Sequence, residues 1–468
     1  MAPPMTTQQR LVIAVAVLAS FVAFLDGTVV TVALPAIDRD LGGGLTTQQW
    51  VVDAYLITLG ALILLAGSVS DAFGRILVLR IGLIGFGVAS VAIALAPDPI
   101  VLIVARALQG AAGAFLVPSS LALITSTFRD AAQGRAIGIW TALTTCAMLA
   151  GPVIGGLFVD LLSWRLAFLI NVLPIGITLW LLTRLTHRDE RRPDASIDWL
   201  GAALCTLGLG GFVFALIEQP NLGWGSPLIL ITGIGGVIMF TAFLIRQRTA
   251  PAPILPLGLF RVRNFWTGNV ATAFVYGALT LNGFVVGVYL QQGAGLSATL
   301  AGLASLPGTL LLILLSSRVG ALAGRLGPRL FMTVGPLVMA AGALLLLTVR
   351  DDFSYWTQVL PGILVFGLGI SLTVAPLTSA ILGSIDTARS GIASAVNNAV
   401  SRVAGLIVIA LLATIVGGSL DLDGFHRAAI VTAALMVVGG LVSFAGIRNP
   451  PRTATSEPAA DASSGPAR

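Results

Sequence analysis

The sequence predicts an all-α protein that crosses a membrane fourteen times, and three observations support this fold class. Hydrophobic residues make up 56% of the chain and charged residues only 10%, whereas soluble domains carry about 25% charged residues. Apolar runs recur along the chain, and each is long enough for the roughly 20 residues with which a helix crosses the hydrocarbon core. The arginines concentrate in alternate loops between these runs. The solvent of this protein is therefore expected to be the lipid bilayer.

The apolar runs predict the individual helices. The first run contains Asp26 and continues directly into a second span, so we interpret it as a retained helix and not as a cleaved signal peptide. The expected spans are 11–36, 48–69, 76–96, 100–126, 135–159, 164–185, 197–218, 226–246, 265–291, 297–320, 329–348, 354–383, 390–417 and 427–447.

The distribution of arginine predicts the orientation. All 26 basic residues are arginines, and with fourteen spans both termini lie on one side. Loops on that side hold 20 arginines, loops on the other side hold 4, and Arg106 and Arg402 lie within spans. Under the positive-inside rule both termini are expected in the cytoplasm. Membrane topology thus explains the basic net charge of +6, and nucleic acid is excluded as the reason for it.

An internal repeat predicts the domain organisation. The stretch GSVSDAFGR from Gly67 is echoed by GALAGRLGPR from Gly320, and the stretch from Leu116 is echoed from Val374. Parallel repeats of this kind are typical of transporters, whose substrate path lies between the halves. We therefore expect a six-helix bundle at 1–192, two additional transmembrane helices at 193–250, a second six-helix bundle at 251–448 and a disordered cytoplasmic tail at 449–468.

Three charged residues inside the spans predict a site. At 1.5 Å per residue, Asp26, Asp53 and Arg106 lie about 14, 8 and 9 Å below the outer ends of their helices, in the external half of the bilayer. A buried guanidinium needs a carboxylate partner, and these two acids are at comparable depth. One of them is expected to exchange a proton in competition with a substrate; the alternative is a static ion pair that orients helices.

Two glycine-containing motifs predict close helix contacts and turns. The loop after the second span contains Gly67, Asp71, Gly74 and Arg75, where glycine lets helices approach or turn and Asp71 can pair with arginine. The fifth span contains a second motif, in which glycines permit close packing and a proline permits a bend. Its residues are Gly151, Pro152, Gly155 and Gly156.

Polar residues within the spans predict a substrate cavity. Asn397, Asn398 and Arg402 belong to one polar face of an otherwise apolar helix. The alternative for this face is hydrogen bonding between helices. Further cavity candidates bear amide or aromatic groups, and they are Gln109, Trp140, Asn269, Tyr276 and Asn282. Glu218 lies at the outer interface, where a structural or solvated acid is expected.

At these residues the chain resembles the major facilitator superfamily, and specifically its fourteen-helix branch of drug:proton antiporters. The resemblance covers nearly the whole chain. It rests on the LDxTVV-ALP pattern of the first span, the G-x-x-x-D-x-x-G-R loop, the R-x-x-Q-G pattern at Arg106, the antiporter-type GP-x-x-GG pattern at Gly151, and WR-x-x-F-x-x-N at Trp164 to Asn171. It implies a multi-pass plasma-membrane exporter, expected to be a bacterial monomer, that uses the proton gradient and no cofactor to move small amphiphilic substrates.

Other functions are weighed against drug export. Within transport, the alternative is an exporter of an endogenous lipid or secondary metabolite. A membrane enzyme or sensor is disfavoured because the sequence has no phosphate-binding loop, no metal-binding cluster and no nucleophile elbow. Cys146 and Cys205 lie in apolar runs and indicate neither a disulfide nor a metal site.

Overall fold

The computed structural model describes residues 5–186, 196–386 and 389–449, and these ranges contain helices but no strand. Fourteen of their helical segments are long and apolar enough to cross a membrane. The predicted fold class and number of spans are confirmed. The expected disordered tail lies outside the described residues except for Asn449.

The first bundle contains the first six spans, two of which are divided into two helical segments. It comprises α1 (Thr7–Leu41), α2 (Gly44–Phe73), α3 (Arg75–Ala94), α4 (Pro99–Gly113) with α5 (Leu116–Thr127), α6 (Asp130–Leu161), and α7 (Leu166–Leu169) with α8 (Val172–Thr183).

The remaining spans form a helix pair and the second bundle. The pair is α9 (Trp199–Leu222) and α10 (Pro227–Thr249). A short 3₁₀ segment, η1 (Leu257–Arg261), leads to the second bundle. This bundle comprises α11 (Arg263–Gln292), α12 (Ala298–Ala304) with α13 (Leu306–Leu326), α14 (Pro328–Leu345) with η2 (Leu346–Thr348), η3 (Tyr355–Val359) with α15 (Leu360–Leu382), α16 (Ser390–Ala410) with α17 (Leu412–Val416), and α18 (Leu422–Gly446).

Several spans that the sequence predicts as single helices are interrupted in the structure. In three of them a proline follows the break closely, at Pro118, Pro174 and Pro307. Proline lacks the N–H of a helical hydrogen bond and clashes with the preceding turn. The fourth break, at Leu411, lies next to two carbonyl groups that accept hydrogen bonds from Gln49 of α2.

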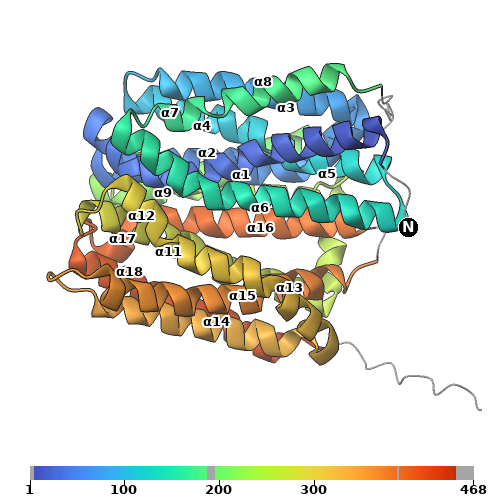
Figure 1. The fold of residues 1–468 in the computed structure, drawn as a ribbon. Helices are drawn as coiled ribbons and strands as arrows, with labels where there is room; N and C mark the ends of the chain where they lie inside the picture. Colours follow the sequence, from blue (N-terminus) through green and yellow to red (C-terminus); the bar gives the residue numbers. More distant parts are fainter. Residues whose placement is uncertain (1–4, 187–195, 387–388, 450–468) are drawn as a thin grey trace, which may run out of the picture.

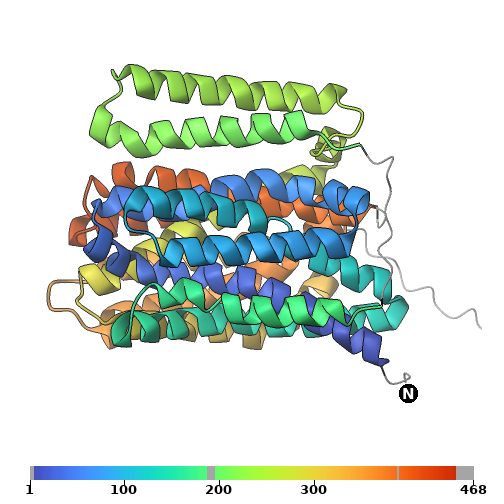
Figure 2. The ribbon, with the colours of Figure 1, turned by 90° about the horizontal axis from the view of Figure 1, so that it is seen from above.

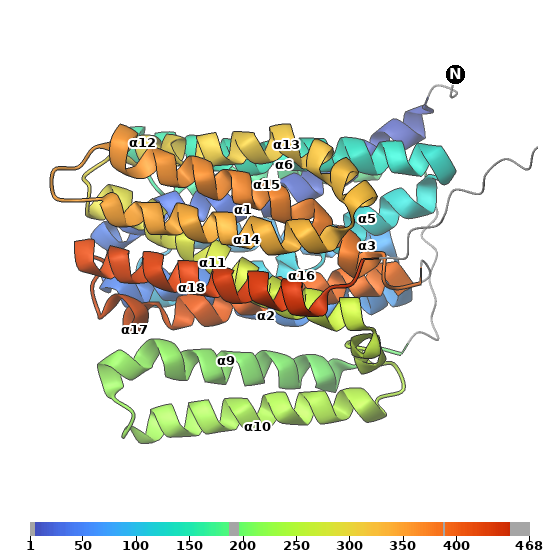
Figure 3. The same ribbon diagram turned by 90° about the horizontal axis from the view of Figure 1, so that it is seen from below.

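The α9–α10 pair lies beside the two bundles and not between them (Figures 2 and 3). α9 packs against α2, while α10 contacts mainly α9. At one end of the pair Asp198 caps α9 and binds Arg246 of α10 at 2.6 Å. At the other end Trp50 of α2 donates a hydrogen bond of 2.7 Å to Glu218. Glu218 is thus a structural acceptor that ties the pair to the first bundle.

The two bundles meet mainly along three helix pairs, α2 with α16, α6 with α12, and α1 with α11, with smaller contacts of α1 with α12 and of α2 with α17. We call the side where α1 begins and α18 ends the terminal side, and the opposite side the far side (Figure 1). Hydrogen bonds join the bundles on the far side: Gln49 donates to the carbonyl of Ile409, and the carboxylate of Asp160 accepts from the backbone of α12.

Candidate functional site

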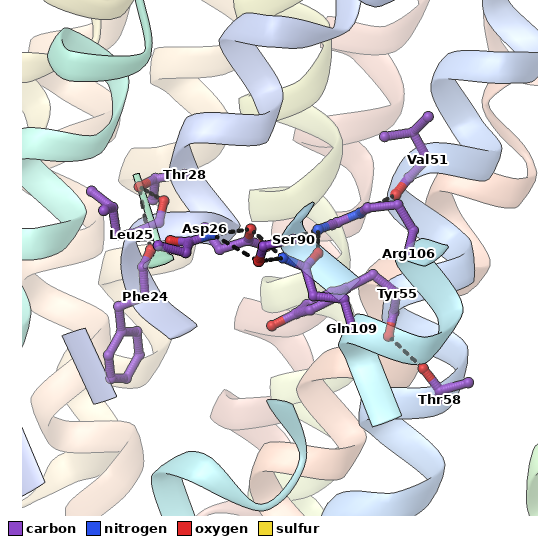
Figure 4. A network of polar contacts seen from close by, with 11 residues as sticks. Phe24, Leu25, Asp26, Thr28, Val51, Tyr55, Thr58, Ser90, Arg106 and Gln109 are labelled. Carbon is purple, nitrogen blue, oxygen red and sulfur yellow. Dashed lines mark hydrogen bonds and ion pairs between the residues drawn. The ribbon is translucent and has the colours of Figure 1, made fainter. Parts of the chain in front are cut away.

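The centre of the first bundle holds a buried ion pair. Asp26 lies in the middle of α1 and Arg106 in α4, and each side chain is only 1% exposed. The Nη1 atom of Arg106 lies 2.7 Å from Oδ2 of Asp26 (Figure 4). The structure therefore gives the buried guanidinium a carboxylate partner, and that partner is Asp26.

Amide groups complete the coordination of this carboxylate. Gln109 and Asn171 each donate to Oδ1 of Asp26, at 2.9 and 3.0 Å. The amide of Gln109 also donates to Ser90 at 2.9 Å, and its carbonyl oxygen accepts from Arg106 at 2.5 Å. The Asp26 carboxylate thus accepts from one guanidinium and two amides, so that both of its oxygens are bonded.

Arg106 is held by α2 as well as by Asp26. Its Nε atom donates to the carbonyl oxygen of Val51 at 2.9 Å. Its guanidinium carbon lies 4.3 Å from the centre of the Tyr55 ring, within the range of a cation–π interaction. Because removing one member of a buried pair strands the other charge, such a deletion costs about 3–5 kcal/mol.

The R-x-x-Q-G pattern of α4 has a direct structural explanation. Arg106 and Gln109 are one helical turn apart and face α1 together. Gly110 is adjacent to the carbonyl oxygen of Tyr55, and a Cβ at this position would overlap that oxygen. The glycine therefore lets α4 approach α2 closely enough for Arg106 to reach Val51.

Asp53 lies outside this network. It is fully buried in α2, and both carboxylate oxygens lack a hydrogen-bond partner among the residues that the structure describes. Gln49, one turn earlier on the same face, bonds to α16. Asp53 therefore belongs to the face of α2 that is turned away from Arg106, although the two residues have similar depths.

A cavity of about 280 Å³ lies between the bundles. Thr28 and Thr31 of α1 line it, as do Asn282 of α11, Pro152 of α6 and Gly302 of α12. Helical geometry puts Thr28 and Thr31 on the face of α1 opposite to Asp26. One helix thus connects the buried ion pair to the cavity wall.

Most of the other predicted cavity residues are engaged elsewhere in this conformation. Gln109 belongs to the ion-pair network, and Trp140 is buried with its indole N–H bonded to Ser20. Asn269 accepts from Asn397 at 3.2 Å, which ties α11 to α16. This contact is the interhelical hydrogen bonding that the sequence left as the alternative for the polar face.

The remaining predicted cavity residues make fewer polar contacts through their side chains. Tyr276 is half-buried and packs on apolar clusters of the second bundle. The backbone carbonyl of Asn398 accepts a hydrogen bond from the Ser401 hydroxyl. Arg402 is half-buried beside Gly60 of α2, and its Nε atom has no hydrogen-bond partner in the described part of the chain.

The glycines of α6 make the close contacts expected of them. Cβ atoms on Gly151 and Gly155 would press against Thr28 and Val32 of α1, and one on Gly156 would overlap the backbone of Thr299 in α12. Gly156 therefore packs against the second bundle, whereas the other two pack within the first.

The loop motif between α2 and α3 differs in part from expectation. Arg75 donates to the carbonyl of Ala122 at 3.2 Å and lies 3.5 Å from the carboxylate of Asp71, and both side chains are partly exposed. Gly74 has φ 101°, which only glycine adopts readily. The expectation that Gly67 permits a helix contact is wrong in this conformation, because that position is exposed and an added Cβ would meet no atom within 4 Å.

Three contributors to the site were missed from the sequence. In the sequence Asn171 ends the WR-x-x-F-x-x-N pattern, which by itself assigns it no role, and nothing distinguishes Ser90 and Tyr55 from ordinary residues of an apolar helix. Asn171 lies at the break between α7 and α8, and its position after a WR-x-x-F pattern was the one usable indication.

Comparison with known proteins identifies the family. The family model of the Major Facilitator Superfamily matches residues 16–409. The chain belongs to the Major Facilitator Superfamily. With fourteen membrane-length helices in its described ranges it is a multi-pass plasma-membrane protein, and it has the transporter fold of that family.

Relatives with resistance functions cover most of the chain. It is 36% identical over 410 residues to the puromycin resistance protein pur8 of Streptomyces alboniger, which covers 86% of this chain and 80% of that protein. It is 33% identical to the methylenomycin A resistance protein of Bacillus subtilis (strain 168), over 86% of this chain and 87% of that one. The tetracenomycin C resistance and export protein of Streptomyces glaucescens is 33% identical, over 86% and 74%.

Solved structures support the fold. A D-xylose-proton symporter superposes with a TM-score of 0.70 at 15% identity, covering 94% of this chain and 98% of that one. A peptide transporter in complex with sulfate gives a TM-score of 0.69 at 15% identity, covering 94% of each chain. At this identity the similarity concerns the fold alone.

Proposed function

We propose that this transporter exports amphiphilic or lipophilic drugs and antibiotics across the plasma membrane by alternating access, in exchange for protons. The observation that supports this most strongly is the buried pair of Asp26 and Arg106, because Asp26 lies on α1 and the opposite face of α1 lines the cavity. The 20 to 4 distribution of arginines supports a cytoplasmic terminal side. The far side, where the bundles are joined, is then the outer side.

Charge balance suggests how a proton acts on this site. With Asp26 ionised, the pair is neutral and α1 is held to α4 by the network around the carboxylate. A proton on Asp26 would leave Arg106 as an uncompensated buried charge, which favours a rearrangement of α1 against α4. Because Thr28 and Thr31 lie on the cavity face of α1, such a rearrangement would alter the cavity wall.

Asp53 is the alternative proton site. An ionised carboxylate without a hydrogen-bond partner is costly inside a protein, and both carboxylate oxygens of Asp53 lack such a partner among the described residues. Asp53 lies on the face of α2 that contacts the second bundle, and separation of the bundles would change its surroundings. Asp26→Asn and Asp53→Asn, compared in gradient-driven transport, distinguish the two acids.

The cavity favours a substrate of low charge. Its lining is dominated by glycine and aliphatic side chains, and the polar groups are hydroxyls and the amide of Asn282. None of the residues that line it in the described structure is charged. Neutral lipophiles and monocations therefore fit better than highly charged compounds, and the resistance functions of the relatives are consistent with such substrates.

Two motifs are proposed to act as gates. On the terminal side, the loop of Asp71, Gly74 and Arg75 links α2 and α3 to the carbonyl of Ala122. On the far side, Gly156 of α6 packs on α12 of the other bundle. Alternating access requires that contacts on the two sides form in turn.

A second candidate is export of a metabolite that the host makes itself. The tetracenomycin C relative is an export protein as well as a resistance protein. The same cavity and coupling would serve such a substrate. Export of a lipid would need a wider lateral opening, and a sensor would bind ligand without flux.

Reconstitution into proteoliposomes with an imposed pH gradient tests the proposal, with labelled puromycin as the first probe. We expect the gradient to drive puromycin against its concentration gradient. Collapsing the gradient with a protonophore should abolish accumulation, and empty liposomes are the control. Flux that ignores the gradient would contradict proton coupling, and binding without flux would favour a sensor.

A further inference from the structure

A carboxylate at the far end of α6 bridges the two bundles. Asp160 is the penultimate residue of α6 and belongs to the first bundle. One carboxylate oxygen accepts the backbone N–H of Ala298 at 3.0 Å, and the other accepts that of Thr299 at 2.8 Å. These are first-turn N–H groups of α12, which have no partner within their own helix. One side chain of the first bundle therefore caps a helix of the second.

The backbones of α6 and α12 touch directly beside this cap. Gly156, one turn before Asp160 on the same face of α6, lies against the backbone of Thr299. Gly302 of α12 lies against the carbonyl of Pro152, and a Cβ on either glycine would overlap the facing backbone. The two helices are thus in contact over more than one turn. Asp160 lies at the end of this contact that is nearest the far side.

The cavity begins where this contact ends. Pro152 of α6, together with Ala301, Gly302 and Ser305 at the end of α12, lines the cavity. The contact between α6 and α12 therefore covers the cavity on the far side. If the two helices separated, this cover would be removed and solvent on that side would reach the cavity.

We propose that Asp160 is a latch of the outer gate: its two hydrogen bonds to α12 stabilise the state closed on the far side and break when that side opens. The negative charge matters because an ionised acceptor at a helix N-terminus binds N–H groups more strongly than a neutral one. This inference rests on the proposed alternating access, and it assigns a role to a residue beyond the glycine motif of α6.

Thiol labelling tests the latch without any substrate. The two native cysteines are replaced, Cys146→Ser and Cys205→Ala, and Ser305→Cys places a nearly isosteric reporter in the cavity. A membrane-impermeant thiol reagent is then added to the far side of oriented vesicles. We expect Asp160→Ala to raise the labelling rate of the reporter roughly fivefold or more, the size expected for loss of a helix-capping carboxylate.

A graded variant and a matched control sharpen the test. Asp160→Asn keeps one accepting oxygen without the charge, and we expect an intermediate rate. Asp421 caps α18 by accepting the N–H of Gly424 within the second bundle. Asp421→Ala therefore removes the same kind of bond without affecting a bundle contact, and we expect the parent rate.

The partner side of the contact provides an independent variant. Ala298→Pro deletes one N–H that Asp160 accepts, and proline suits the first position of a helix. The preceding Ser297 is already extended, with ψ 157°, as a residue before proline prefers. We expect faster labelling here too, and little additional effect when this change is combined with Asp160→Ala.

The latch is refuted if Asp160→Ala and Ala298→Pro are folded and label at the parent rate, or if Asp421→Ala accelerates labelling equally. Should Asp160→Ala fail to fold, Ala298→Pro decides the question alone. Labelling needs neither a pH gradient nor a transported compound. Failure of puromycin export would therefore count against the proposed function, while failure of the labelling change would count against the latch.

Discussion

Replacing Asp26 by asparagine removes the negative charge of the buried pair while keeping the shape of the side chain. Oδ2 of Asp26 lies 2.7 Å from Arg106, and Oδ1 accepts from Gln109 and Asn171. An asparagine has one accepting oxygen, so its NH₂ group must face either the guanidinium or the two amides. Stranding a buried charge costs about 3–5 kcal/mol, and we expect the free energy of unfolding to fall by about 3 kcal/mol.

The same substitution is expected to abolish gradient-driven transport, whereas it lowers the stability only in part. Since asparagine cannot take up a proton, puromycin accumulation driven by a pH gradient should disappear in Asp26→Asn, while puromycin binding or downhill exchange persists. Asp26→Glu should retain part of the accumulation, because it keeps an ionisable group beside Arg106. Arg106→Ala should impair accumulation too, because it leaves the buried carboxylate of Asp26 without its positive partner.

The assay is gradient-driven uptake into proteoliposomes, with circular dichroism and size-exclusion chromatography confirming folded protein. Asp98→Asn is the matched control, because Asp98 caps α4 outside the network by accepting the N–H of Val101. Wild-type accumulation by Asp26→Asn would refute the coupling role of Asp26, and Asp53→Asn would then be tested in the same way. Loss of folded protein in both Asp26→Asn and Arg106→Ala, together with full accumulation by Asp26→Glu, would support a static ion pair.

Three further predictions concern packing, pH and topology. Gly110→Ala should lower the free energy of unfolding by about 1–3 kcal/mol, because its Cβ would overlap the carbonyl of Tyr55. Gly67→Ala should leave the free energy of unfolding unchanged, because its Cβ would meet no atom within 4 Å. Thermal unfolding in detergent compares the two variants, and equal effects would contradict the close approach of α4 to α2 at Gly110. Burial raises the pKa of Asp198, but hydrogen bonds led by that from Arg246 outweigh it and hold the pKa below its usual value. The stabilisation by Asp198 is therefore fully present above about pH 4 and is lost as the pH falls further through the lowered pKa. The melting temperature of wild type should exceed that of Asp198→Asn at pH 7, and the difference should shrink progressively below about pH 4; a constant difference would refute this. Tags at the two termini should both react only from the cytoplasmic side, and opposite accessibility would overturn the orientation.

The sequence predicts how deep the site lies in the membrane, but not which way each helix faces about its own axis. Counting residues from the helix ends placed Asp26, Asp53 and Arg106 in one layer, and a rise of 1.5 Å per residue makes such heights dependable. Partner choice depends on which way each helix faces, and this is set by packing with other helices. α2 turns Val51 and Tyr55 toward Arg106, which leaves Asp53 on the other face.

Similar reasons explain the outcome for the polar residues. An amide within an apolar span signals that it has a partner, but the sequence does not distinguish a substrate from another helix. Gln109 and Asn269 are bonded to protein groups, whereas Asn282 lines the cavity. Asp160 gave no signal at all, since an acid at a helix end near the membrane surface is unremarkable until a second helix is placed against it.

The sequence by itself determined the solvent, the number of spans, the repeat and the requirement for a carboxylate near Arg106. These follow from local hydropathy and from the cost of an unpaired charge in a bilayer, which depend on composition and position along the chain. Tertiary structure alone decided that Asp26 is the partner, that α1 connects this pair to the cavity, and that Asp160 bridges the bundles. The ion pair joins residues 80 positions apart and the Asp160 bridge joins residues 139 positions apart, and both exist only because packing fixes the rotation and approach of each helix.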